Sequence, residues 1–174
     1  VHAQTVDLTN GLISHWKFDE TTGDVAVDSK GVSNATAATG TTIVDGKFNK
    51  ARDTGNSGYL TAPNNQAYVQ NNFTVAGWVK PTSFGLNNYA SIFSRRTASN
   101  FGMYIEYLGD PGAGNGELQC HIDRSIDTDP NVHGIRVRTT AKLTANQWNF
   151  VACSYDGTTL KVYINGAAAG SVTG

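Results

Sequence analysis

Three segments with strand patterns carry polar and aromatic side chains at every second position. Successive side chains of a strand point to opposite faces, so apolar residues directed to a core leave their neighbours directed outward. If the segments are neighbours, these outward side chains share one face. Such a mixture binds sugars, because an aromatic ring stacks on a pyranose while polar groups bond its hydroxyls. The outward residues are Tyr104, Glu106, Gln119, His121, Asp123, Arg136 and Arg138.

The same face has a plainer explanation. Glu106 and Asp123 can form cross-strand ion pairs with the arginines on a solvated outer sheet, which needs no ligand. A basic and aromatic segment around Tyr89 and Arg95 is expected to edge the same surface, and the arginines would suit an acidic polysaccharide. We predict a ligand-binding face of Tyr104, Glu106, His121, Asp123, Arg136 and Arg138, edged by Tyr89 and Arg95.

Oxygen-bearing side chains gather near glycines in the turn-rich stretch 19–46. Calcium takes carboxylate, amide and backbone oxygens in loops, so this stretch is a candidate structural calcium site. Asp and Asn also bond their own backbone in turns, which explains them without a metal. Zinc has less support, because Cys120 and His121 are adjacent in a strand and point to opposite faces. The calcium candidates are Asp19, Glu20, Asp28, Asn34, Asp45 and Gly46, with a weaker second set at Asp110, Asn115 and Glu117.

The two cysteines, Cys120 and Cys153, both lie in segments with strand patterns. An even number of cysteines in an exported protein permits one disulfide bridge. Two buried free thiols on neighbouring strands are the alternative, since a free cysteine packs as a small hydrophobe. The sequence leaves both alternatives open.

The composition favours one all-β domain. The chain has 174 residues, enough for one core of ordinary size, and its 19 glycines and 16% charged residues suit short strands joined by tight turns. A net charge of −1 supplies no field for gathering phosphate groups, so nucleic acid is not an expected partner. No apolar run reaches the roughly 18 residues of a membrane helix, so we expect no membrane insertion.

The first residues, Val1-His2-Ala3-Gln4, place small side chains where a signal peptidase cuts. This pattern predicts a secreted protein, and an ordinary polar tail is the alternative. We therefore take residues 1–10 as an N-terminal tail and residues 11–174 as the folded domain.

Strand patterns recur at short intervals and indicate a sandwich or jelly roll. The segment 91–95 is expected to pair with 73–80. The glycine-rich loop 109–116 should join two strands in a hairpin, as should the turn Asp156-Gly157-Thr158-Thr159. The expected strands are 11–18, 35–37, 73–80, 91–95, 102–108, 117–124, 135–139, 148–155 and 160–164.

Four stretches form a further pattern: LISHWKFDE at 12–20, VDGKF at 44–48, FTVAGWVKP at 73–81, and WNFVACSYDG running into LKVYING at 148–166. In this order they resemble the laminin-G-like members of the concanavalin A-like lectin/glucanase superfamily. The resemblance covers residues 11 to about 170. It implies two antiparallel sheets packed face to face, with Trp16, Trp78 and Trp148 in the core. It is less specific for function, because a fold does not fix an activity.

The resemblance also bears on the metal site and on the end of the chain. Relatives often hold a structural calcium near the first strand, and by that resemblance Asp19 and the Asp45-Gly46 turn are the best matches. Relatives continue past the Tyr-x-Asn-Gly strand into a further strand, which supplies another calcium ligand in several of them. This chain stops at Gly174, so we expect the last strand of the sandwich to be missing.

Some relatives are glycoside hydrolases, which place two carboxylates about 5 Å apart on one strand, often as Glu-x-Asp-x-x-Glu. That spacing does not occur in this sequence. Asp123, Asp127 and Asp129 are spaced by four and two residues in loop-like sequence. A serine–histidine–aspartate set could be drawn from His121 and Asp123, but no motif supports it. We therefore expect no catalytic residues.

The sequence thus predicts a secreted, non-catalytic module that binds a glycan or polysaccharide or acts in adhesion. The main rival is a structural subunit whose open sheet edge accepts a strand from another copy or from a neighbouring domain. Residues 1–10, in which Val6 and Leu8 alternate, could be the donated strand. A glycoside hydrolase is the third hypothesis.

Overall fold

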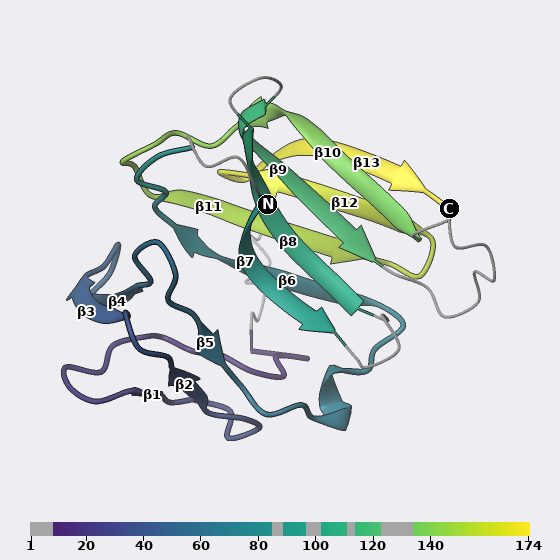
Figure 1. Ribbon diagram of the computed structural model, residues 1–174. Coiled ribbons are helices and arrows are strands. Elements are labelled where there is room, and N and C mark those ends of the chain that lie inside the picture. The colour runs from purple at the N-terminus through teal and green to yellow at the C-terminus, as the bar shows by residue number, and fades with distance from the viewer. Residues whose placement is uncertain (1–8, 85–88, 97–101, 111–113, 123–133) are drawn as a thin grey trace, which may run out of the picture. The chain divides into compact units, whose positions relative to one another are not determined.

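The computed structural model describes residues 9–84, 89–96, 102–110, 114–122 and 134–174 (Figure 1). Within these ranges the regular structure is β-strand, apart from one 3₁₀ turn, η1 (Gln66–Tyr68). The predicted all-β class is confirmed. The chain divides into two compact units, Val1–Gln70 (unit 1) and Asn71–Gly174 (unit 2). The single domain over residues 11–174 stays a prediction.

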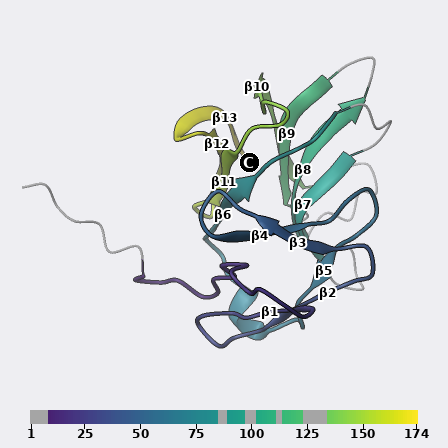
Figure 2. The ribbon, with the colours of Figure 1, turned by 90° about the vertical axis from the view of Figure 1, so that its left-hand side faces the viewer.

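Unit 2 is a sandwich of two four-stranded antiparallel sheets. The first sheet has the strand order β10-β9-β8-β7, and the second sheet has the order β13-β12-β11-β6. Figure 2 shows the two sheets edge on, as two facing layers. The strands are β6 (Phe73–Val79), β7 (Tyr89–Arg96), β8 (Gly102–Asp110), β9 (Gly114–Ile122), β10 (Ile135–Lys142), β11 (Asn149–Tyr155), β12 (Thr159–Ile164) and β13 (Ala167–Thr173).

The hydrophobic core of unit 2 lies between these two sheets. A disulfide joins Cys120 on β9 to Cys153 on β11, so it crosses from one sheet to the other, with Cα atoms 6.4 Å apart. Of the two alternatives that the sequence leaves open, the structure has the bridge. The buried residues around it are Ile105, Leu118, Val137, Leu143, Val151, Leu160, Val162 and Ile164.

The strand β13 follows the Asn165-Gly166 turn, where the sequence predicted that the last strand is missing. It pairs with β12 along its whole length. Its composition of alanine, glycine and serine gives little strand signal. The small side chains have a packing reason, because a Cβ added to Gly170 would lie 2.9 Å from Cγ2 of Val137 on β10. The close approach of the two sheets therefore requires residues that a strand pattern does not reveal.

Three further expectations are wrong, two about unit 2 and one about residues 11–18 of unit 1. The strand β7 pairs with β8 in the first sheet, and not with β6, which lies in the second sheet. Trp78 is 40% exposed, because the alternation of β6 directs Val75 and Val79 to the core. No strand forms over residues 11–18, where the structure has only an isolated bridge between Trp16 and Asp28 and a left-handed φ of 60° at Phe18.

Unit 1 is made of short strands joined by turns. A three-stranded sheet has the order β1-β2-β5, and β3 pairs with β4 in a hairpin. The fully buried apolar side chains of its described residues are small: Ala26, Ala35 and Ala37. We therefore expect hydrogen bonds and ion pairs to contribute a larger share of the stability of unit 1 than of unit 2. The strands are β1 (Val25–Ala26), β2 (Ala35–Ala37), β3 (Thr42–Asp45), β4 (Lys50–Asp53) and β5 (Leu60–Thr61).

Removing the bridge tests the sandwich. Replacing both Cys120 and Cys153 by alanine should lower the free energy of unfolding by about 2–4 kcal/mol, because the unfolded chain regains the entropy of an open loop. The measurement is denaturant unfolding of the two proteins with and without reductant. Reductant should destabilise the wild-type protein and leave the double variant unchanged. A wild-type protein with the same stability in both conditions would contradict the bridge.

Candidate functional site

The outer side of the first sheet carries the residues that the sequence predicted to share a surface. The inward residues Ile105, Leu118 and Val137 are buried in the core, which confirms the predicted alternation on three strands. The β8–β9 hairpin, predicted from the glycine-rich loop, is also present. We call the outward residues the polar face: Tyr104 and Glu106 on β8, Glu117, Gln119 and His121 on β9, and Arg136 and Arg138 on β10.

The register of the strands arranges one row across the polar face. Tyr104 is opposite Ser94 on β7 and His121 on β9, and His121 is opposite Arg136. The Tyr104 hydroxyl forms a hydrogen bond with His121 Nδ1. The two rings meet edge to face, with centroids 4.6 Å apart and an interplanar angle of 85°. The histidine therefore holds the tyrosine ring in a defined orientation.

A second row lies next to the first. Glu106 is opposite Gln119, and Gln119 is opposite Arg138. Gln119 Nε2 donates a hydrogen bond of 2.7 Å to Glu106 Oε1, and Arg138 Nε donates to Glu117 Oε2. Glu117 was missed as a member of this face, because the sequence analysis considered it only as a calcium candidate at the start of the expected strand 117–124. Glu117 precedes Gln119 by two residues and His121 by four, so alternation along a strand places all three side chains on the same face. This spacing was the signal in the sequence that could have identified Glu117.

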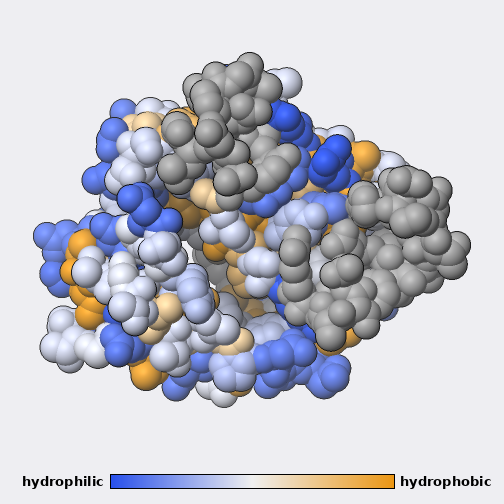
Figure 3. Space-filling model, in the orientation of Figure 1, coloured by the Kyte–Doolittle hydropathy of each residue, from blue (hydrophilic) through white to orange (hydrophobic). Residues whose placement is uncertain are grey.

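The central strand of the polar face is covered by its neighbours. Gln119 and His121 are each only 5% exposed, whereas Arg136 and Arg138 are exposed and Tyr104 and Glu106 are half-buried. The expectation that His121 is exposed is therefore wrong, although its side chain points away from the core. Figure 3 views the outer side of the first sheet, where hydrophilic side chains gather over β9 and β10 between the grey atoms.

Of three further predicted members of the surface, Arg95 is not brought to it, and the side chains of the other two are outside the described part of the structure. Arg95 on β7 is opposite Met103, so it shares the inward face, and its Nε is buried without a hydrogen-bond partner among the described residues. Tyr89 begins β7, but its side chain lies outside the described part of the structure. Asp123 lies outside the described residues.

In unit 1, the turn-rich stretch is organised around the carboxylate of Asp28, which is 3% exposed. Burial raises the pKa of this carboxyl, but the hydrogen bonds donated by the His15 backbone and the Ser14 hydroxyl, with others, outweigh it and hold the pKa well below 3.8. Asp28 is thus an ionised acceptor. The donors are Ser14 Oγ at 2.7 Å, His15 N at 2.9 Å, Lys30 N and Val32 N at 3.0 Å, and Ser33 N at 3.1 Å.

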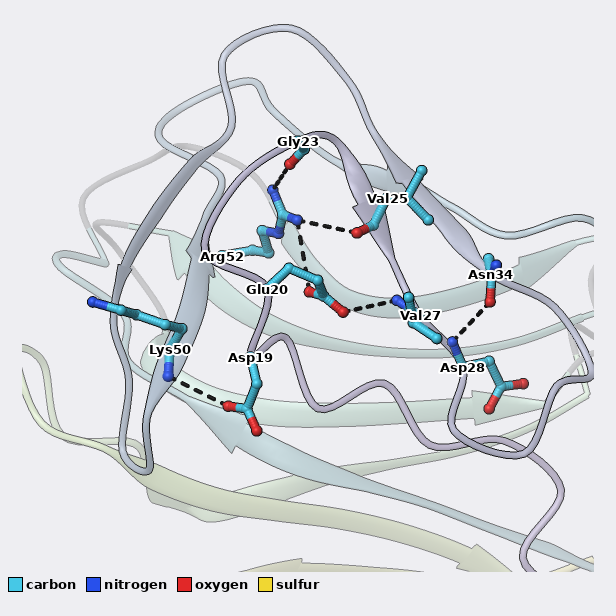
Figure 4. A network of polar contacts seen from close by, with 9 residues as sticks. All are labelled: Asp19, Glu20, Gly23, Val25, Val27, Asp28, Asn34, Lys50 and Arg52. Carbon is cyan, nitrogen blue, oxygen red and sulfur yellow. Dashed lines mark hydrogen bonds and ion pairs between the residues drawn. The ribbon is translucent and has the colours of Figure 1, made fainter.

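The other calcium candidates also have protein partners (Figure 4). Asn34 Oδ1 accepts from the Asp28 backbone N–H at 2.9 Å, and Asp19 accepts from Lys50 N at 3.4 Å. Asp45 forms a 2.7 Å ion pair with Lys50 Nζ, and this hydrogen bond and charge lower the Asp45 pKa. Gly46 is in the turn because a Cβ would lie 2.4 Å from Lys50 O.

These contacts are made within the protein. Among the described residues, no three His, Cys, Asp or Glu side chains lie together as metal ligands would. The arrangement is explained by turns and by the salt bridge between Arg52 and Glu20, in which N and O are 3.7 Å apart. The structural calcium ion stays a prediction.

The comparisons with known proteins identify the fold family. A model of the concanavalin A-like lectin/glucanases superfamily matches residues 54–174, which include all of unit 2. The chain belongs to this superfamily. No curated protein matches the sequence. No helix among the described residues is long and apolar enough to cross a bilayer.

Two solved structures resemble this superfamily member. Domain 4 of AbnA, a GH43 extracellular arabinanase from Geobacillus stearothermophilus, was solved in complex with arabinotriose; it has a TM-score of 0.65 and 23% identity, over 92% of this chain and 74% of that one. A fragment (residues 221–444) of an S-layer domain-containing protein from Clostridium thermocellum has a TM-score of 0.59 and 23% identity, over 91% and 71% of the two chains. These similarities show the fold alone.

Acid should lower the free energy of unfolding of this concanavalin A-like chain, because it protonates the carboxylate of Asp28. Its folded-state pKa lies below its unfolded value of 3.8, so its stabilising effect is complete above about pH 5 and is lost as the pH falls through the folded-state pKa. Asp28→Asn should cost about 2–4 kcal/mol at pH 7, because several charged hydrogen bonds weaken together. Urea unfolding at pH 7, 4 and 3 measures the difference, which should shrink toward pH 3. The exposed Asp24→Asn is the control, and an equal loss in both variants at pH 7 would contradict the role of Asp28.

The calcium prediction has a separate test. A calcium ion bound by Asp19 and the Asp45-Gly46 turn stabilises only the folded state, so excess calcium should raise the melting temperature above the value in EDTA. Asp45→Asn should remove that difference. Identical melting curves of the wild-type protein in calcium and in EDTA would contradict the prediction of a calcium site.

Proposed function

We propose that this chain is a non-catalytic carbohydrate-binding module of an exported protein, and that the polar face binds an oligosaccharide. The observation that carries the proposal is the row across three strands that holds the Tyr104 ring, oriented by His121, and the exposed Arg136 on the far side of His121. An oriented aromatic ring offers a stacking surface for a sugar ring, and a guanidinium offers up to five N–H donors to sugar oxygens.

The network behind this row favours binding because it is formed before a ligand arrives. Gln119 and His121 are buried and bonded to Glu106 and Tyr104, so these four side chains do not have to be ordered by the sugar. Ordering a flexible side chain on binding costs about 0.5–1.5 kcal/mol. A polar face with fixed rotamers avoids much of that cost.

Two further observations support the proposal. The similar domain 4 of AbnA belongs to an extracellular enzyme and was solved with arabinotriose, and oligosaccharide binding is proposed here by analogy with that domain. The Cys120–Cys153 bridge suits an oxidising compartment, as expected of an exported protein.

The non-catalytic part of the proposal rests on the carboxylates. Glycoside hydrolysis requires two carboxyl groups placed on either side of a scissile bond. The polar face has two described carboxylates, and each is held by a neighbour: Glu106 by Gln119, and Glu117 by Arg138. His121 bonds Tyr104, which does not match the serine–histidine–aspartate arrangement. Assembly through an open sheet edge stays a prediction.

Replacing the tyrosine tests the proposed site. Tyr104→Ala should lower the affinity for arabinotriose, or for another neutral oligosaccharide selected on a glycan array, by about tenfold, since stacking and its buried area are lost. Tyr104→Phe should retain most of the affinity, because it keeps the ring. The measurement is titration calorimetry with thermal melts of each variant.

Tyr163→Ala is the matched control, because Tyr163 lies on the outer face of the second sheet, opposite Ala152. It should leave the affinity unchanged. Equal affinities of Tyr104→Ala and the wild-type protein, with unchanged melting, would show that the polar face is only a solvated surface.

A further inference from the structure

We infer that the polar face recognises saccharides that carry a carboxylate, such as uronic acid oligomers, and that Arg136 selects them. The inference rests on the proposed function, because it names the class of sugar that the same face takes. It follows from the way charges and hydrogen-bonding groups are distributed over β8, β9 and β10.

The first step concerns charge. Arg138 is paired with Glu117, and the other described carboxylate of the face, Glu106, accepts a hydrogen bond from Gln119. Arg136 is exposed, and its side chain has no hydrogen bond or ion pair with a described residue. Arg136 is therefore the one arginine of the polar face without an ion pair among the described residues.

The second step concerns which groups a ligand can reach. A neutral sugar needs donors and acceptors together, because each hydroxyl both donates and accepts. The amide of Gln119 and the imidazole of His121 would meet that need, but both are buried and already bonded. The exposed side chains of β10 opposite His121 and Gln119 are the guanidiniums of Arg136 and Arg138, which donate only. Arg136, which has no carboxylate partner among the described residues, fits a carboxylate better than a hydroxyl.

The third step concerns position. Arg136 is opposite His121, and His121 is opposite Tyr104, so guanidinium and phenol ring are separated by one strand. Neighbouring strands lie about 4.8 Å apart, so the two side chains are about 10 Å apart at their roots. A sugar ring stacked on Tyr104 can therefore direct a carboxylate toward Arg136, where the planar fork accepts it in a bidentate manner.

The test uses a matched pair of ligands, trigalacturonate and its methyl ester, in which a methyl group replaces the negative charge of each carboxylate. The wild-type protein should bind trigalacturonate about tenfold more tightly than the ester, and raising the salt concentration should reduce that preference. Arg136→Gln should abolish the preference, because it should weaken the binding of trigalacturonate about tenfold more than the binding of the ester, while Arg136→Lys should restore part of the preference. Lys161→Gln is the control, because it removes the same charge from the outer face of the second sheet, where Lys161 is opposite Ser154.

The outcomes separate the two proposals. Equal affinity of the wild-type protein for trigalacturonate and its ester overturns the inference, and binding of neutral arabinotriose in the same experiment would leave the proposed function standing. An equal loss of preference in Arg136→Gln and Lys161→Gln would also overturn it, because only net charge would then matter. Absence of binding to any of these ligands overturns both the inference and the proposed function.

Discussion

Cys120 on β9 and Cys153 on β11 meet where the two sheets of unit 2 face each other, and both are fully buried. Their bridge determines which side of β9 is inside. Because a strand alternates with a period of two, Gln119 and His121 must then point outward. Antiparallel pairing transfers this choice to Tyr104 on β8 and Arg136 on β10. The composition of the polar face is thus a consequence of one covalent contact in the core.

The outer face departs from a simple solvated sheet in the middle strand. Burying a polar side chain costs free energy unless it is hydrogen-bonded. Gln119 and His121 meet this requirement through Glu106 and Tyr104. A face that served only for solubility would have no need to bury these groups. Bonded pairs next to a half-buried ring and an exposed guanidinium are the arrangement that the proposed binding surface requires, in which the buried members orient the ones that would touch a ligand.

Alternation in the sequence predicted most strands of unit 2 and the members of the polar face, because inward and outward residues differ in polarity there. Alternation failed to predict the structure where close packing, local hydrogen bonds or contacts between distant segments determine it. In β13, close sheet packing selects small residues such as Gly170. At 11–18, the apolar alternation suggested a strand, but hydrogen bonds from Ser14 and His15 to Asp28 hold the segment outside any sheet. The burial of His121 depends on neighbours from other strands, which no local pattern contains. The pairing of β7 with β8, and not with β6, likewise depends on contacts between separate strands, which the pattern within one strand does not contain.

The two units depend on different chemistry. Unit 2 has a continuous apolar core crossed by a disulfide, so its stability depends on an oxidising environment. Unit 1 has only small buried apolar side chains, and its loops converge on one ionised carboxylate. Satisfying five donors with Asp28 replaces part of the burial that larger side chains would provide, but it makes unit 1 sensitive to acid. The polar face lies wholly on unit 2. Binding at that face should therefore respond to reductant at neutral pH, whereas the loops around Asp28 should lose stability as the pH falls below 3.8 toward the folded-state pKa of this carboxyl.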